Sequence, residues 1–145
     1  MKSLNLPQYD CKVKEVDGKQ YIYDAIRKKY LVLTPEEWVR QHFINLLVTQ
    51  YKYPRSMFAL ETGHKYQTLS KRSDILIFSN TGTPFLLVEC KAPEILLNQN
   101  VFNQIAQYHH TIRPTFLAVT NGLEHYCFQS SDQGVIFLDN FPVYC

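Results

Sequence analysis

The sequence predicts an α/β, or α+β, fold in which helices flank a central mixed β-sheet. Helical and strand patterns follow one another as helix, three strands, helix, strand and a β-rich tail over 145 residues. The second helix is long enough to cross the sheet, so the strands before and after it are expected to be parallel. With 46% hydrophobic and 19% charged residues, the composition is that of one globular domain.

The N-terminal part of the chain gives few structural signals. Residues 19–24 predict a short strand, because they follow the turn-forming pair Asp17-Gly18. We divide the single domain 1–145 into an N-terminal extension (1–30), a core (31–128) and a C-terminal β tail (129–145).

The first predicted helix runs from Thr34 to about Gln50. Thr34 is a good N-cap, Pro35 suits the first helical position, and Glu37 completes a capping box. Apolar residues then recur at helical spacing, and Pro54 lies beyond the end of the helix.

Short apolar and β-branched segments, bounded by turn residues, predict the sheet. The three strands after the first helix are placed at residues 56–61, 74–78 and 84–91, with a polar loop at 62–70 and a turn at 79–83. An apolar stripe predicts the second helix at 98–110. Further strands are expected at 115–120, 126–128 and 135–138, with a turn at Asn121-Gly122.

Composition and charge exclude several classes of protein. The formal net charge of +2 is too small to identify a nucleic-acid binder, although Lys71 and Arg72 form a local basic pair. The four cysteines have no zinc-site spacing. No signal peptide and no apolar run of membrane-spanning length is found, so we expect a cytoplasmic protein with free thiols and no membrane association.

Three charged residues lie in or beside apolar strands. Side chains alternate along a strand, so Glu89 and Lys91 share one face and Cys90 points into packing on the other. A two-residue turn at Thr81-Gly82 pairs position 78 with 85 and position 74 with 89. Directly opposed residues share a face, so this register brings Asp74 beside Glu89.

Two adjacent carboxylates repel each other unless one is protonated or a cation lies between them. Mg²⁺, which prefers oxygen ligands, would make Asp74 and Glu89 a phosphodiesterase site with Lys91 stabilising negative charge. Alternatively, Lys91 forms a cross-strand salt bridge that neutralises the acids on a wet face of the sheet. Spacing alone leaves these two interpretations about level.

The chain also resembles a known family in several ordered stretches. Asp74 followed by Glu89-Cys90-Lys91 resembles the D…E-x-K core of the PD-(D/E)XK nuclease superfamily, and more narrowly the N-terminal nuclease domain of type I restriction enzyme R subunits. The resembling stretches are residues 33–41, 71–74, 88–93, 103–108 and 120–122. The resemblance covers about residues 30–128 and implies a restriction-endonuclease-like sandwich.

The resemblance implies a role for each matching residue. Asp74 and Glu89 would bind Mg²⁺ or Mn²⁺, with the Cys90 carbonyl as a further ligand, and Lys91 would be the catalytic lysine. Glu37 would be the helical acid, near the metal directly or through water, beside its capping role. The DNA-binding candidates are Gln104, Tyr108, Lys71 and Arg72. Gln104 and Tyr108 lie four residues apart and share a helix face, which also suits a packed helix surface.

The resemblance implies a metal-dependent deoxyribonuclease of a restriction-modification or DNA-processing system. R subunits carry a helicase motor, but this sequence contains no G-x-x-x-x-G-K-[ST] motif, so we expect a motor or specificity subunit to be a separate partner. Cutting both strands needs two sites, which suggests a homodimer. The alternatives are a catalytically silent nucleic-acid-binding or assembly module with the nuclease fold, and a nuclease acting on RNA or branched DNA.

Overall fold

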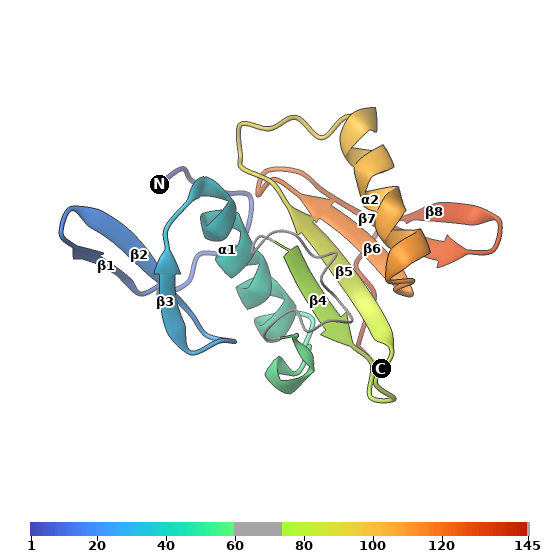
Figure 1. The fold of residues 1–145 in the computed structure, drawn as a ribbon, viewed down its shortest axis with the longest axis horizontal. Helices are drawn as coiled ribbons and strands as arrows, with labels where there is room; N and C mark the ends of the chain where they lie inside the picture. Colours follow the sequence, from blue (N-terminus) through green and yellow to red (C-terminus); the bar gives the residue numbers. More distant parts are fainter. Residues whose placement is uncertain (60–73, 145) are drawn as a thin grey trace.

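The structure is a computed structural model that describes residues 1–59 and 74–144, without the side chains of residues 108 and 109. It contains a five-stranded mixed sheet, two helices and a separate three-stranded sheet (Figure 1). The predicted mixed α/β sandwich is confirmed. The end of the predicted strand 56–61, the loop 62–70 and the basic pair Lys71 and Arg72 lie outside the described residues.

The main sheet has the strand order β4-β5-β6-β7-β8. Its strands are β4 (Asp74–Phe78), β5 (Pro84–Cys90), β6 (Phe116–Thr120), β7 (His125–Ser131) and β8 (Gly134–Leu138). β5 and β6 are parallel, as predicted, and α2 (Gln99–Thr111) connects them; the other neighbours are antiparallel. β7 and β8 therefore form a regular hairpin that extends the sheet, and the described residues after Leu138, 139–144, are not strand.

The β4–β5 hairpin decides where the charged side chains lie. Asp74 pairs with Glu89, and the pairing continues regularly to Ile77 with Leu86, as predicted. An irregularity between Ile77 and Phe78 then pairs Phe78 with Pro84, so the predicted pairing of position 78 with 85 is wrong. The irregularity lies next to the turn, where an extra residue is absorbed without moving the far end of the hairpin.

Helix α1 (Pro35–Thr49) begins as the sequence predicts. The Thr34 hydroxyl accepts the Glu37 backbone N–H at 3.0 Å, and Pro35 occupies the first turn. The Glu37 carboxylate accepts hydrogen bonds from Arg40 and Gln41, further along the helix. Of the two hydrogen bonds of the predicted capping box, the described contacts therefore show the one that Thr34 accepts.

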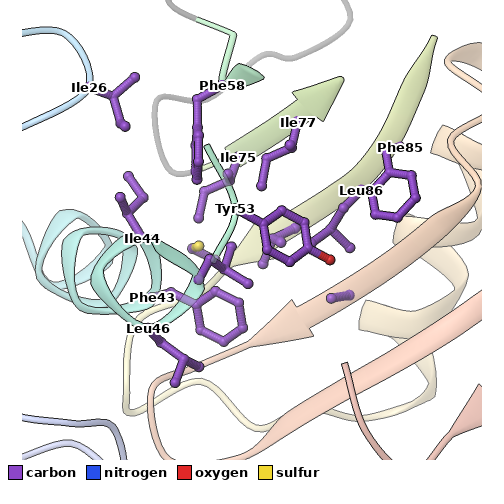
Figure 2. Close-up of a cluster of buried hydrophobic side chains, with 14 of the residues drawn as sticks. Ile26, Phe43, Ile44, Leu46, Tyr53, Phe58, Ile75, Ile77, Phe85 and Leu86 are labelled. Atoms are coloured by element: carbon purple, nitrogen blue, oxygen red, sulfur yellow. The ribbon is translucent and has the colours of Figure 1, made fainter. Parts of the chain in front are cut away.

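The two helices cover opposite faces of the main sheet. α1 packs on the face formed by Ile75, Ile77, Leu86 and Val88, and Figure 2 shows Phe43 and Ile44 of α1 within this cluster. α2 packs on the opposite face through Val101 and Ile105, against Leu76, Leu87, Leu117 and Val119. Because side chains alternate along strands, the face of any β4 or β5 residue follows from its position.

The segment between α1 and β4 departs from prediction. Residues 56–61 were predicted as a strand, but Arg55–Met57 form a 3-10 turn (η1), with the Met57 and Phe58 N–H groups donating to Pro54 and Arg55. Within the described residues 56–59, Phe58 bridges Ile77 and the Ala59 N–H donates to the Leu76 carbonyl at 2.8 Å. Pro54 favours this tight turn because it lacks an N–H for a strand ladder.

The N-terminal extension contains more structure than predicted. The expected strand is confirmed as β2 (Lys19–Asp24), and β1 (Val13–Val16) and β3 (Lys29–Val32) flank it in an antiparallel sheet. This sheet lies beside α1, away from α2 (Figure 1). Asp24, the last residue of β2, is fully buried and accepts a hydrogen bond from Arg40 of α1.

Candidate functional site

Asp74 and Glu89 occupy directly opposed positions at one end of the β4–β5 hairpin. Their side chains share the α2 face, because Leu76 and Leu87, two residues along each strand, belong to the cluster packed under α2. Only 5% of Asp74 and 1% of Glu89 is exposed. The structure thus brings two buried carboxyl groups of neighbouring strands together on one face.

Lys91 and Gln104 meet beside this pair. The Lys91 ammonium lies 3.4 Å from Glu89 Oε1 and donates to Gln104 Oε1 at 3.0 Å. Gln104 comes from α2, and the Lys91 backbone N–H donates to Thr120 at the end of β6. The ammonium is therefore held between a strand acid and a helix amide, on a residue that its backbone anchors to the sheet.

Glu37 belongs to a buried ion network on the α1 side. Glu37 Oε2 accepts from Arg40 Nη1 at 2.9 Å and from Gln41 Nε2 at 2.7 Å. Arg40 Nη1 also donates to Asp24 Oδ2 of β2 at 2.8 Å. All four side chains are buried. This network joins the N-terminal sheet to the first turns of α1.

Arg40 also connects this network to the start of β4. Its Nε donates to the main-chain carbonyl of Asp74 at 3.4 Å. The same guanidinium therefore contacts Asp24, Glu37 and the backbone of the residue that presents one of the two paired acids. Through Arg40, the position of Asp74 depends on the α1 network as well as on the strand ladder.

Charge and burial set the protonation of the network. Burial raises the pKa of Asp24, but the Arg40 guanidinium and its hydrogen bond outweigh this and lower it to about 2. Burial also lowers the pKa of Arg40, while Glu37 and then Asp24 raise it above the usual value. At neutral pH the network therefore holds a carboxylate of Asp24 and a charged guanidinium.

Cys90 has no reactive character in this setting. Its side chain packs in the α1-side cluster, as alternation predicts. Burial raises the pKa of the thiol well above its ordinary value, and nearby Asp74 and Glu89 raise it further against the opposing effect of Arg40. The thiol stays protonated, so Cys90 serves packing and is no nucleophile.

The Asp74–Glu89 pair has the donor chemistry for a hard divalent cation. Both offer carboxylate oxygens, the ligands that Mg²⁺ prefers. Glu89 Oε2 is buried and has no hydrogen-bond partner among the described residues. A buried, unsatisfied carboxylate oxygen is costly, and a cation would satisfy it. These residues therefore fit a metal.

In the described part of the chain, two acidic side chains, Asp74 and Glu89, lie together at this end of the β4–β5 hairpin. Among the described residues, no group of three or more His, Cys, Asp and Glu side chains is close enough to hold a metal ion. Glu37 is accordingly not grouped with Asp74 and Glu89 as a third acidic ligand. The predicted role of Glu37 near the metal through water stays a prediction.

The remaining predicted residues are placed only in part. Tyr108 lies on α2 four residues after Gln104, but its side chain is outside the described part, as are Lys71 and Arg72 altogether. Sequence reasoning missed Asp24 and Arg40. Arg40 could have been found, because it lies three residues before Phe43 and seven before Leu47, where a charge on the apolar stripe of a helix requires a buried partner.

Comparison with protein families identifies a match over most of the chain. A family model described as "Type I restriction enzyme R protein N terminus (HSDR_N)" matches residues 35–142. No curated protein and no solved structure matches the chain. In the part of the chain that the structure describes, no helix has both the length and the apolar character to cross a membrane.

Proposed function

The chain belongs to the family of type I restriction enzyme R protein N termini, and from this we propose that it is a metal-dependent DNA endonuclease domain of a restriction or DNA-processing system. One observation carries the proposal. Two buried carboxyl groups, Asp74 and Glu89, are directly opposed on neighbouring strands, and Lys91 lies beside them on the same face.

In this proposal Asp74 and Glu89 hold Mg²⁺ or Mn²⁺, with the Cys90 carbonyl as a further ligand. The bound ion would polarise the phosphate and lower the pKa of a bound water. The support is the oxygen donor set and the buried Glu89 Oε2 without a hydrogen-bond partner in the described part. Asp74 and Glu89 must be ionised to act, and the cation offsets their mutual repulsion.

Lys91 would act on the substrate itself. Its ammonium can donate to a phosphate oxygen or hold the attacking water, and so stabilise the negative charge that develops as the phosphodiester bond breaks. Gln104 Oε1 accepts from the ammonium at 3.0 Å, which restricts the long lysine side chain to one orientation. A donor that is already held in position has little conformational freedom left to lose during the reaction, whereas a flexible donor would lose it then.

DNA would approach from the side of the sheet that carries α2. Gln104, Tyr108, Lys71 and Arg72 are the proposed DNA contacts, and contacts to phosphates would make binding weaken as salt rises. We include a separate motor or specificity subunit, and a homodimer for cutting both strands, in the proposal.

One observation favours a second candidate function, a catalytically silent nucleic-acid-binding or assembly module with the same fold. Lys91 Nζ lies 3.4 Å from Glu89 Oε1, which is also the geometry of a structural ion pair. In that case Lys91 neutralises the buried acid and no metal is needed. The two candidates differ in whether Mg²⁺ binds and whether DNA is cut.

The test combines cleavage with metal binding. Purified protein is incubated with supercoiled, linear and single-stranded DNA and with RNA, in Mg²⁺, Mn²⁺ or chelator, and Mn²⁺ binding is measured by electron paramagnetic resonance. We expect metal-dependent cleavage of DNA that Asp74→Asn and Lys91→Ala abolish. Only Asp74→Asn should also weaken Mn²⁺ binding. Asp139→Asn, an exposed acid, is the matched control.

The outcomes separate the candidates. DNA binding without cleavage, in every metal and with no Mn²⁺ bound, would support the silent module. Cleavage that survives Asp74→Asn would refute the site assignment. Cleavage confined to RNA would move the substrate class and keep the site.

A further inference from the structure

A second concave site lies between α1 and the N-terminal part of the chain. A cleft of about 230 Å³ is formed by the N-terminal segment, β2 and α1, with Arg55 at its end. Its polar and aromatic lining includes Tyr9, Lys12, Tyr23, Gln41, Asn45 and Arg55. The volume is below the roughly 300–1,000 Å³ of pockets for drug-sized ligands, so it suits one ring system.

Two tyrosine rings form walls of this cleft. Tyr9 and Tyr23 are half-buried, and Tyr9 is held by an edge-on contact with the His42 ring at 4.9 Å between centroids. Lys12 Nζ lies 5.4 Å from the centre of the Tyr23 ring. Aromatic faces with an adjacent cation are the elements on which unpaired nucleobases stack.

Two amide side chains form its floor. Gln41 and Asn45 are one helical turn apart on α1 and line the cleft. Gln41 Nε2 donates to Glu37 Oε2 at 2.7 Å, which fixes that amide. Asn and Gln amides carry both donors and acceptors, the groups that recognise the hydrogen-bonding edge of a base.

The rim of the cleft carries charge suited to a phosphate. Lys12, which precedes β1, and Arg55, which follows α1, are both exposed and line the cleft. Asp10 is on the same lining and leaves one net positive charge. The cations would bind a phosphate, and the Asp10 carboxylate would accept from an exocyclic amine of the base.

We propose that this cleft binds one unstacked nucleotide, with the base on the tyrosine walls and the amide floor and the phosphate on Lys12 and Arg55. Its source would be a single-stranded segment of the nucleic-acid substrate at a distance from the cleaved bond, which rests on the proposed nuclease function. The floor residue Gln41 bonds to Glu37, and Glu37 to Arg40, which reaches the Asp74 carbonyl. An occupied cleft is therefore three hydrogen bonds from the main chain of Asp74.

The test measures binding in chelator, so that no cleavage is required. The full chain is titrated into a fluorescein-labelled hexadeoxyadenylate and into the same strand with abasic sites, which keeps every phosphate, and anisotropy is recorded. Tyr23→Leu removes the ring, Tyr23→Phe keeps it, and Arg55→Gln removes a rim cation. Lys19→Gln removes an exposed charge outside the cleft, and circular dichroism verifies each fold.

We expect the strand with bases to bind more tightly than the abasic strand, and Tyr23→Leu to weaken it roughly five- to 150-fold, the range for losing one base–aromatic contact. Tyr23→Phe and Lys19→Gln should bind as the unmodified protein, and Arg55→Gln should weaken both strands. If dAMP competes as strongly as the unlabelled strand, the ligand is a free nucleotide. If dAMP competes more weakly, the ligand is a nucleotide within a strand.

Equal binding of the abasic strand, or unchanged binding by folded Tyr23→Leu and Arg55→Gln, would overturn the proposal. Asp74→Asn separates it from the nuclease function. Suppose that Asp74→Asn still binds the labelled strand and that neither the unmodified protein nor any variant cuts DNA. This result supports the cleft and refutes only the proposed nuclease function. Normal cleavage with Tyr23→Leu binding unchanged refutes only the cleft.

Discussion

Asp24→Asn removes one charge from the buried network and little else. Asp24 Oδ2 accepts from Arg40 at 2.8 Å and from Arg27 at 2.9 Å. Its Oδ1 accepts the Ile26 and Arg27 backbone N–H groups at 2.8 and 3.1 Å. Asparagine keeps the shape and one carbonyl acceptor, so the turn after β2 can persist while the ion pairs are lost. Arg40 retains Glu37 as a partner.

The pKa of Asp24 sets the size of the effect. Its neighbours lower that pKa from 3.8 to about 2. A shift of one unit corresponds to about 1.4 kcal/mol, so the folded protein favours the charged form by about 2 kcal/mol. Because the folded pKa is below the unfolded one, this stability is present above about pH 4 and is lost as pH falls towards 2. We therefore expect Asp24→Asn to cost about 2 kcal/mol at pH 7.

Urea denaturation, followed by far-ultraviolet circular dichroism at several pH values from 7 down to 2.5, measures the effect. The difference in unfolding free energy between the unmodified protein and Asp24→Asn should be constant from pH 7 to about 5, then shrink towards zero. Asp139→Asn, an exposed acid, should give no such difference. A gap that stays constant at low pH, or no gap at pH 7, would refute the assigned role of the charge.

Three further predictions concern single side chains. Thr34→Ala removes the cap of α1 and should lower the unfolding free energy by about 1 kcal/mol, measured by urea denaturation; an unchanged midpoint contradicts it. Gly122→Ala puts a Cβ on a residue at φ +87° and 2.7 Å from Leu4 Cδ2, and should cost roughly 1–2 kcal/mol or more in the same assay. Gln104→Leu frees Lys91 and, if the domain is a nuclease, should slow cleavage roughly 10- to 100-fold without a change in melting temperature; equal rates would refute this.

The centre of the fold could be predicted because local rules decide it. The α1 cap, the alternation in β5 and the hairpin register each depend on a few adjacent residues, and together they place Asp74 beside Glu89. The parallel β5–β6 pair followed from the length of α2 alone. Such features need no knowledge of distant parts of the chain.

The features that sequence reasoning missed depend on distant contacts. β1 and β3 are each only four residues long, so their pairing with β2 stabilises them more than their own strand propensity does. The ion pair between Asp24 and Arg40 joins residues of two separate elements, so neither position indicates the other. Likewise, the 3-10 turn at Arg55–Met57 replaces a strand because Pro54 and the adjacent packing favour a turn there.

The choice between a salt bridge and a metal site turns on the second acid. An ion pair of Lys91 with Glu89 accounts for one carboxylate oxygen, Oε1. It leaves Glu89 Oε2 buried without a hydrogen-bond partner in the described part, and it does not require a second carboxyl group at the directly opposed position. Like charges at opposed positions destabilise a sheet, and apolar residues there would stabilise it more. Oxygen donors on both strands are what a divalent cation supplied from solution would bind, and this supports the metal site that we propose.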